Sequence, residues 1–427
     1  MKSLEDITSR IGDGLHGTPK YDDSGDYYFI NGNNLSQDKI TLKKETRRVS
    51  KEEYLKHKKD LNERTLLVSI NGTLGNFAFY NNEKVMLGKS ACYLNLIDDV
   101  DKEYIGYLLK NRHFQKYIDS NATGTTIKNV SLQTIRSYEF ELPPKKNQQD
   151  VSNFLSSFDR KIELNKKMNE TLEDIAKTLF KSWFIDFDPV RAKAEGRPTG
   201  LSKEISDLFP DSYEGSELGE IPKGWKASQV KDFCSVIQKG IAPKYTENQS
   251  YPVINQKCIR NLEINFDLCR FTEYKKVMED RYLENFDILL NSMGTGTLGR
   301  SALFVEHHTK AVVDGCISVI RGKSKNFSLY VYQSISRRED EIINLSQGST
   351  GQTTLKTEDI GNLNLIQPTN ELIELFGKSV ADLHLKKYSN SQENKVLSNL
   401  RDTLLPKLIS GELKISDTEN LIKEAGI

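Results

Sequence analysis

Lysine, arginine and amide side chains recur in this sequence in patterns suited to contacts with a polyanion. The densest basic run, residues 39–60, holds nine Lys or Arg residues against four Asp or Glu residues. Cationic side chains of this kind contact phosphate groups and release counterions, so their affinity falls as salt is added. Arg, Lys, Asn and Gln side chains can also pair with base edges. The basic run alone is equally compatible with a solvated surface.

Candidate contacts with DNA occur in both halves of the chain, around short segments that the two halves share. Hydroxyl groups and one charge in a Thr-Thr-aliphatic-Lys segment could clamp a nucleic-acid backbone, whereas amide and basic side chains could read bases. A role in strand packing is an open alternative for Tyr21 and Ile30. The candidates are Lys20, Tyr21, Asn31, Asn33, Lys43, Lys44, Arg47, Arg48, Thr126 and Lys128 in the first half, and Lys244, Tyr245, Gln256, Lys257, Arg260, Thr354 and Lys356 in the second.

No catalytic or cofactor-binding motif in the sequence is complete. Residues 87–90 (LGKS) match the end of a phosphate-binding loop, but that motif requires glycine where Glu83 stands. His307 and His308 have no carboxylate or cysteine at a ligand spacing, which favours an exposed loop. The Gly-Thr-Gly run at 294–296 opens no GxGxxG motif, and no glycine-rich S-adenosylmethionine site is visible. We therefore expect no catalytic residues and no metal site.

An internal repeat of about half the chain supplies the elements that would position these residues. Three segments return at a nearly constant spacing, 224 residues for the first two and 228 for the third. Between the matches the two halves diverge freely, which is typical of one scaffold presenting two different surfaces. The repeated segments are 19–21 with 243–245, 72–75 with 296–299, and 125–128 with 353–356.

Each half is predicted to combine a strand-rich globular block with one long helix. In both blocks a strand is expected on either side of the glycine-rich turn, at 65–69 and 77–80 and again at 287–290 and 301–305. The expected boundaries are 1–145 for the first block, 146–205 for a long helix and a linker, 206–367 for the second block, 368–413 for the second long helix and 414–427 for a tail.

The two long helices are predicted from apolar residues that alternate in steps of three and four, the period of a helix packed along one narrow seam. One polar residue, Asn165, occupies the first seam, and Asn390 recurs in the same register 225 residues later. A buried asparagine costs stability but fixes register and partner choice. The alternative is a pair of unrelated surface helices. The expected seam residues are Val151, Phe154, Phe158, Met168, Leu172, Ile175 and Leu179, and in the second helix Phe376, Leu383, Leu397 and Leu404.

Composition limits the class of protein. A chain of 427 residues and 48.7 kDa is too long for a single core. A hydrophobic content of 37% and a charged content of 28% suit a polar protein, and no apolar run is long enough to span a membrane. The N-terminus lacks a secretory signal and the five cysteines show no CxxC spacing, so we expect a cytoplasmic protein with reduced thiols. Because the formal net charge is zero, any basic surface has to be local.

Four segments beside the two long helices are distinctive: LFKSWFIDFDPVRAK at 179–193, LFPDS at 208–212, ELGEIPKGW at 217–225 and LLPKLISGEL at 404–413. With their order, spacing and internal duplication, they resemble the conserved regions of specificity (S) subunits of type I restriction-modification systems. The resemblance covers essentially the whole chain. Two departures occur: the first block lacks the Ile-Pro-x-Gly-Trp segment, and Glu393 lies on the seam side of the second helix.

The resemblance implies an α+β fold. Two strand-rich, mixed α/β target recognition domains would form a tandem pseudo-two-fold repeat, separated by two long helices packed as an antiparallel coiled coil. It also implies a non-catalytic subunit that binds double-stranded DNA at an asymmetric, two-part site. Such a subunit docks two methyltransferase (M) subunits and, through them, restriction-translocation (R) subunits. It binds no cofactor itself, since S-adenosylmethionine, ATP and Mg²⁺ belong to the partner subunits.

Two other functions stay open. A methyltransferase or nuclease with built-in readers would need a cofactor domain, for which two repeats leave no room. A coiled-coil adaptor with no DNA role would explain the helices. It would not explain two large divergent blocks that carry matched Lys-Tyr and Thr-Thr-Lys segments.

Overall fold

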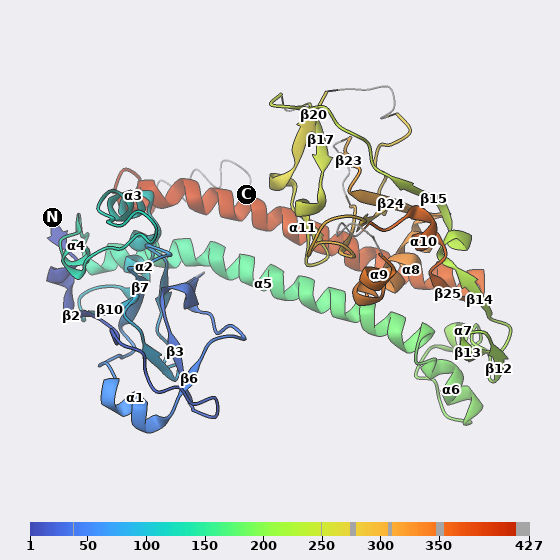
Figure 1. The fold of residues 1–427 in the computed structure, drawn as a ribbon, viewed down its shortest axis with the longest axis horizontal. Helices are drawn as coiled ribbons and strands as arrows, with labels where there is room; N and C mark the ends of the chain where they lie inside the picture. Colours follow the sequence, from blue (N-terminus) through green and yellow to red (C-terminus); the bar gives the residue numbers. More distant parts are fainter. Residues whose placement is uncertain (37, 249, 274–278, 306–309, 347–353, 416–427) are drawn as a thin grey trace. The chain divides into compact units, whose positions relative to one another are not determined.

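The computed structural model describes residues 1–427 apart from 37, 249, 274–278, 306–309, 347–353 and 416–427. His307, His308 and most of the predicted tail therefore lie outside the described residues. The chain forms two compact units, each visible in Figure 1. The first comprises Met1–Glu163 together with the C-terminal stretch from Glu393, and the second comprises Leu164–Gln392. The boundaries of the predicted blocks stay a prediction.

A four-stranded antiparallel sheet, in the order β2-β10-β7-β8, forms the centre of the first unit. The inner strands β7 (Thr65–Ser69) and β10 (Ala91–Leu96) are buried along their whole length, as expected for nearly continuous runs of apolar residues. The outer strands are β2 (Thr8–Asp13) and β8 (Phe77–Phe79).

A smaller sheet, in the order β6-β3-β9, adjoins it. Its central strand β3 (Tyr27–Ile30) pairs antiparallel with β6 (Arg48–Val49) and parallel with β9 (Val85–Leu87). In Figure 1, β3 and β6 lie on the side of this unit away from the long helix.

The helices of the first unit share a core with the large sheet. Buried side chains of β7 and β10 pack with those of α2 (Lys102–Lys110) and α3 (Arg112–Ser120). Each helix begins at a residue whose side chain accepts a backbone N–H, Asp101 before α2 and Asn111 before α3. The shorter elements are β1 (Lys2–Ser3), η1 (Glu5–Ile7), η2 (Gly32–Asn34), β4 (Leu35–Ser36), β5 (Lys39–Ile40), α1 (Lys51–His57), α4 (Leu132–Arg136) and β11 (Glu139–Phe140).

The second unit repeats both sheets. Its large sheet has the order β15-β24-β21-β22, and its small sheet has the order β16-β20-β17-β23 with β17 and β23 parallel. The strands are β15 (Cys234–Lys239), β24 (Ile317–Gly322), β21 (Ile288–Asn291) and β22 (Ser301–Leu303) in the large sheet, and β16 (Tyr245–Thr246), β20 (Arg270–Thr272), β17 (Tyr251–Ile254) and β23 (Val312–Val313) in the small one.

One close backbone approach also recurs. A Cβ atom added to Gly14 would lie 2.1 Å from the carbonyl oxygen of Leu87, and one added to Gly240 would lie 2.2 Å from that of Asp314. Neither position has room for a side chain. The sequence repeat is therefore a repeat of fold, down to individual glycines.

The segment after the first long helix is more than a linker. It contains α6 (Asp188–Ala194) and α7 (Lys203–Ser206), and its residues Val190, Phe209 and Ile221 are buried in the core of the second unit. Prolines and glycines in this segment favoured a linker, but several of its apolar residues pack into this core. The remaining elements are β12 (Tyr213–Ser216), β13 (Gly219–Pro222), β14 (Lys226–Gln229), η3 (Val230–Phe233), η4 (Gln256–Cys258), β18 (Ile259–Arg260), β19 (Glu263–Ile264), η5 (Phe266–Leu268), α8 (Lys325–Ile335), α9 (Glu339–Leu345), α10 (Thr357–Gly361) and β25 (Asn364–Gln367).

Two helices of 40 residues each, α5 (Lys145–Phe184) and α11 (Asn370–Ile409), pack antiparallel. In the first unit Asp159 pairs with Arg401, whereas Lys161 pairs with Glu393. In the second unit Asn169 pairs with Asn390 and Glu173 with Lys387. In both units a higher residue number on α5 pairs with a lower one on α11. The predicted fold, with strand-rich repeats and an antiparallel coiled coil, is confirmed.

The seam of α5 differs from the predicted one at every second position. Phe158 and Asn165 are buried as predicted, but Met168 and Ile175 are 37% and 48% exposed. The buried companions are instead Leu155, Ile162, Asn169, Ala176 and Trp183. The spacing between successive seam residues, counted from Val151, is therefore four and then three residues, not three and then four. Apolar residues lie on both sides of the α5 seam. The prediction selected the side of Met168 and Ile175 because the side that is in fact buried carries the polar residue Asn169.

Neither a membrane span nor a disulfide occurs in the part of the chain that the structure describes. No helix there is both long enough and apolar enough to cross a bilayer. All five cysteines are free thiols. The Sγ atoms of Cys258 and Cys269 lie 3.8 Å apart, at the distance of a thiol hydrogen bond.

Ile162 and Ile175 give a matched test of the seam, because both are isoleucines on α5 and only Ile162 is buried. We expect Ile162→Ala to lower the free energy of unfolding by about 2–4 kcal/mol. Ile175→Ala should lower it by less than about 1 kcal/mol. Chemical denaturation of the full chain measures both. Equal losses, or a larger loss at Ile175, would show that the helices pair along the other flank.

Candidate nucleic-acid interface

The first repeated segment places a lysine and a tyrosine at the edge of the small sheet in the first unit. Tyr21 forms an antiparallel bridge with Val49 of β6, and its ring meets that of Phe29 edge-on at 6.0 Å. The Cζ atom of Arg47 lies 4.4 Å from the centre of the Tyr21 ring, a cation–π contact. Lys20 and Arg47 are exposed, so their charges face solvent.

The second unit repeats this arrangement with one addition. Tyr245 lies in β16 and pairs with Thr272 of β20, and Lys244 before it is exposed. The Tyr245 hydroxyl donates to Oδ2 of Asp314 at 3.3 Å. Burial and, after it, the neighbouring Asp314 carboxylate raise the pKa of Tyr245, so the hydroxyl stays protonated at neutral pH.

The glycine-rich turn of the first unit is tied to the 3₁₀ helix η2. The Thr73 hydroxyl donates to the carbonyl oxygen of Gly32 at 3.0 Å. The Gly32 N–H donates to Oγ of Ser90 at 2.9 Å, and the Ser90 hydroxyl donates to Oδ1 of Asn31 at 2.8 Å. The Asn31 side chain is therefore used in stabilising the turn, whereas the next candidate, Asn33, is exposed.

The Thr-Thr-aliphatic-Lys segment of the first unit lies beside the same turn. The Gly72 N–H donates to the carbonyl oxygen of Lys128 at 3.0 Å. Thr126 and Lys128 are exposed, although the Lys128 ammonium lies 3.0 Å from a carboxylate oxygen of Asp119. Two of the repeated segments and η2 therefore gather at one place.

The second unit gathers its candidates in the same way. The Thr297 hydroxyl, the counterpart of Thr73, donates to Oε1 of Gln256 at 3.0 Å. Gln256 is therefore occupied within the fold, while Lys257 and Arg260 are exposed.

The Thr-Thr-Lys segment again lies alongside the glycine-rich turn. Thr354 forms an antiparallel bridge with Met293, and the Leu355 N–H donates to the carbonyl oxygen of Ser292 at 2.9 Å. Lys356 is exposed and follows directly. Thr353, the first threonine of this segment, lies outside the described residues.

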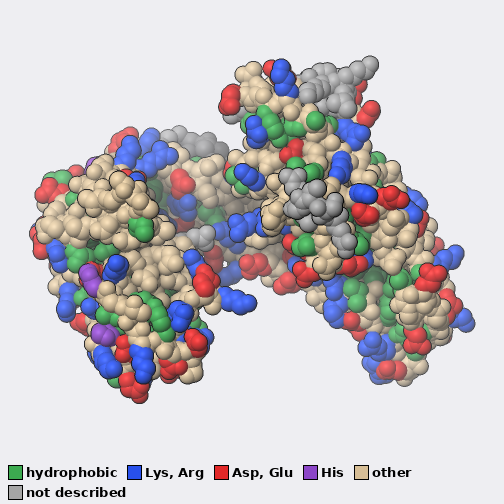
Figure 2. Space-filling model, in the orientation of Figure 1, with side chains coloured by type: hydrophobic (Ala, Val, Ile, Leu, Met, Phe, Trp, Pro, Cys, Tyr) green, Lys and Arg blue, Asp and Glu red, His purple; other side chains and the backbone are tan. Residues whose placement is uncertain are grey.

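Three candidates from the basic run differ in how far their side chains are engaged within the fold. Lys43 and Lys44 are exposed in the turn before β6. Arg48 instead stacks on Tyr28, with Cζ 4.6 Å from the ring centre, and its Nη2 donates to the Tyr28 hydroxyl at 2.6 Å. Its guanidinium is thus partly used within the fold. Figure 2 shows Lys and Arg side chains interspersed with Asp and Glu on the visible face, as the zero net charge requires.

Comparison with known proteins identifies the family. A family model described as the type I restriction modification DNA specificity domain matches residues 2–174. The type I restriction enzyme MjaIX specificity subunit of Methanocaldococcus jannaschii is 30% identical over 365 residues, which cover 83% of this chain and 78% of that one. This chain belongs to the family of type I restriction enzyme specificity subunits. It is accordingly a recognition subunit and not a catalytic one.

Further similarities agree with this membership. The type I restriction enzyme HindI specificity subunit of Haemophilus influenzae is 27% identical over 368 residues, covering 75% of this chain and 76% of that one. A crystal structure of the type I restriction-modification S subunit from M. genitalium has the same fold, with a TM-score of 0.58 at 17% identity over 96% of this chain and 95% of that one.

The two seam asparagines of this specificity subunit are both buried, each 1% exposed. Asn390 Nδ2 donates to Oδ1 of Asn169 at 2.9 Å, and Asn169 Nδ2 lies 3.2 Å from the Ser391 hydroxyl. Asn390 thus pairs with Asn169, a residue that the expected seam left out. The role of Asn165 and Asn390 in fixing register stays a prediction.

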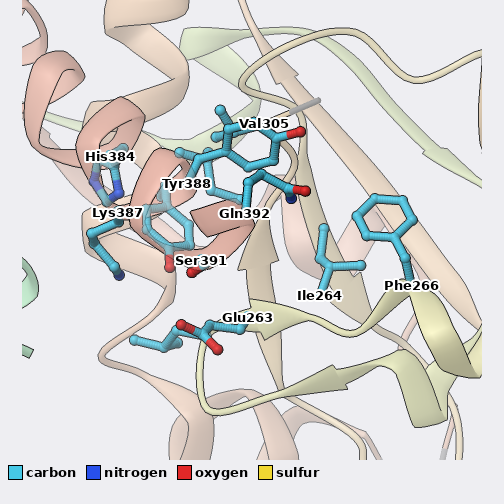
Figure 3. Close-up of a pocket in the computed structure, with 12 residues that line it drawn as sticks. Glu263, Ile264, Phe266, Val305, His384, Lys387, Tyr388, Ser391 and Gln392 are labelled. Atoms are coloured by element: carbon cyan, nitrogen blue, oxygen red, sulfur yellow. The ribbon is translucent and has the colours of Figure 1, made fainter. Parts of the chain in front are cut away.

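Charged side chains continue this polar seam in the second unit. The Lys387 ammonium contacts the Glu173 carboxylate, which is buried. Burial alone would raise the pKa of Glu173, but the Lys387 charge and hydrogen bond outweigh it and lower the pKa. Figure 3 shows Lys387 and His384 on α11 next to a pocket of about 110 Å³ that Ile264 and Phe266 also line.

His384 is a further titratable group of this seam. Burial and, after it, the Lys387 charge lower the pKa of His384 to about 4, while Glu173 acts in the opposite direction. The neutral imidazole faces Gln333, with 3.4 Å between the two Nε2 atoms. Because the unfolded chain takes up a proton near pH 6.5 and the folded chain near pH 4, folding favours the neutral ring.

This stabilisation should be fully present above about pH 6.5 and be lost as the pH falls toward 4, by on the order of 3 kcal/mol at most. The pKa of Glu173 is lowered from 4.5, so the stabilisation that Glu173 contributes is lost only below about pH 4.5. We expect His384→Gln to flatten the fall in melting temperature between pH 7 and pH 4.5. Parallel curves for the two proteins would show that His384 is not the titrating group.

Proposed function

We propose that this specificity subunit binds double-stranded DNA through two recognition domains, each reading one part of an asymmetric, two-part site. The observation that carries the proposal is the repeated gathering of candidate residues. In each unit, hydrogen bonds connect a glycine-rich turn to a 3₁₀ helix and to the described part of a Thr-Thr-Lys segment. Exposed basic and amide side chains project from this scaffold.

The scaffold is the same in both units and the exposed side chains differ. Asn33 and Lys257 occupy equivalent positions, 224 residues apart, and both are exposed. An amide can both donate and accept at adenine, whereas an ammonium only donates, as at guanine O6 and N7. Two readers with different donors and acceptors fit two different half-sites.

Lysines common to both units are suited to the sequence-independent part of binding. Lys20 and Lys244 are exposed and precede the repeated tyrosines. Phosphate contacts of this kind fix orientation on the duplex without reading bases. Lys43 and Lys44 add charge in the first unit alone, so the two domains would differ in their share of the salt-dependent affinity.

The exposed stripe on α5 is the best candidate for docking a methyltransferase subunit. Leu164, Met168 and Ile175 are each more than a third exposed. At 3.6 residues per turn they project within about 40° of one another, beside the buried seam. A stripe of large apolar side chains on a solvated helix fits an amphipathic helix of a partner. The restriction-translocation subunits would bind through the methyltransferase subunits. S-adenosylmethionine, ATP and Mg²⁺ would be bound by these partners and not by this chain.

Replacing one stripe residue by a charge tests the docking proposal. We expect Ile175→Asp to weaken co-purification with the methyltransferase subunit of the same system at least tenfold, since an unpaired charge would be buried in the interface. The unfolding of the free chain should change little. Lys166→Asp is the control, because Lys166 is exposed on α5 away from the stripe. Normal assembly of the Ile175→Asp chain would exclude this stripe.

Methylation mapping tests the recognition function itself. The full chain is co-expressed with its methyltransferase subunit, and modified bases are mapped on genomic DNA. We expect one asymmetric motif in two parts with a fixed gap, because two different readers lie on one chain. Binding to a duplex carrying the motif should fall steeply as salt is raised. A stable complex that neither modifies nor selectively binds DNA would contradict the proposal and favour a coiled-coil adaptor.

A further inference from the structure

Arg270, a residue outside the repeated sequence segments, occupies the same place in the second unit as Arg47 in the first. The strand pairings establish the equivalence. Val49 pairs with both Tyr21 and Tyr27. Thr272 pairs with both Tyr245 and Tyr251, the counterparts of those tyrosines in the repeat. Arg47 and Arg270 each precede this doubly paired residue by two positions.

The geometry of a sheet brings each arginine onto a tyrosine. Residues two apart on a strand point to the same face, and a diagonal neighbour across an antiparallel pair is within reach of a long side chain. Arg47 is accordingly stacked on Tyr21, with Cζ 4.4 Å from the ring centre. Arg270 is stacked on Tyr245, with Cζ 3.4 Å from the ring centre. The contact is thus built into the register of both small sheets.

The donors of both guanidinium groups face solvent. Arg47 and Arg270 are exposed, and within the described residues no side-chain hydrogen bond or ion pair holds either guanidinium. Some other arginines of the chain are instead held by carboxylates: Arg321 pairs with Asp287, and Arg401 with Asp159. Stacking orients the plane of a guanidinium while leaving its N–H donors free at the edge. This combination suits a group that reads a base.

We propose that Arg47 and Arg270 are equivalent base-reading residues, one in each recognition domain, that each reads a guanine, and that Tyr21 and Tyr245 hold them in position. A guanidinium donates two parallel hydrogen bonds to O6 and N7 of guanine in the major groove. Holding the plane in advance reduces the rotamer freedom lost on binding. Lys20 and Lys244 next to the tyrosines would contact the flanking phosphates. The inference rests on the proposed DNA-binding function and adds a base to each half-site.

The test compares the motifs selected from random double-stranded DNA by the full chain, co-purified with its methyltransferase subunit, and by its variants. Arg270→Ala should reduce the preference for guanine at one position of one part of the motif about tenfold or more. The other part should be unchanged. Arg47→Ala should do the same in the other part. Arg270→Lys keeps the charge but loses the planar fork, so it should weaken the guanine preference less than Arg270→Ala does and retain more affinity.

Two further variants separate positioning from folding. Tyr245→Leu removes the stacking face and should weaken the same base preference, whereas Tyr245→Phe keeps the ring and should restore it. Melting temperatures of all variants control for folding. Arg197→Ala is the charge-matched control, because Arg197 is exposed and pairs only with nearby Glu195 in the described structure. It should leave the motif unchanged.

The outcomes distinguish this inference from the function on which it rests. If the unaltered chain selects no two-part motif, the proposed function fails. If it selects one and Arg270→Ala selects the same motif, the inference alone fails. A uniform loss of affinity at all sequences would assign Arg270 to phosphate contact and would also overturn it.

Discussion

Buried polar side chains pair between α5 and α11 in the second unit, and we expect these pairs to fix the register of the two helices. An apolar seam can shift by a heptad at modest cost, because one aliphatic side chain replaces another. The Asn169–Asn390 hydrogen bond and the Glu173–Lys387 ion pair cannot shift in this way. Breaking a buried ion pair costs about 3–5 kcal/mol, and each unpaired buried amide adds about 1–3 kcal/mol. We therefore expect one register to be strongly preferred.

The recognition domain of that unit is attached to the helices through an aromatic cluster that needs this register. Phe180 and Phe184 of α5 contact Phe376 of α11, with ring centres 5.6 and 5.2 Å apart. Both rings also contact Tyr330 of α8, at 5.4 and 4.9 Å. The Tyr330 hydroxyl donates to the carbonyl oxygen of Ile366, so the cluster reaches the last strand of the domain. A shift of either helix would remove several of these contacts together.

Sequence reasoning recovered what depends on local pattern. The repeat follows from identical segments, strand β7 at Thr65–Ser69 from an apolar run beside a glycine-rich turn, and the end of α5 at Phe184 from helical periodicity. The seam flank was wrong because burial of Asn169 is decided by its partner on another helix. Asn31 and Gln256 were selected as readers by residue type, but their side chains are used in turns. Arg270 was missed because it lies at an offset of 223 residues from Arg47, so only strand pairing reveals the match.

The two tyrosine–arginine pairs occupy equivalent positions, but the contacts that hold each tyrosine in place differ. Asp314 follows β23 and accepts the Tyr245 hydroxyl, whereas Gly88 stands at the equivalent place after β9. The carboxylate also attracts Arg270 electrostatically. Tyr245 is therefore held at both its ring and its hydroxyl, and Arg270 lies nearer its ring than Arg47 lies to Tyr21. A reader ordered in advance loses less entropy on binding. Divergence between the repeats thus changes the rigidity of a reading group as well as the identity of its neighbours, while the sheet that carries it stays the same.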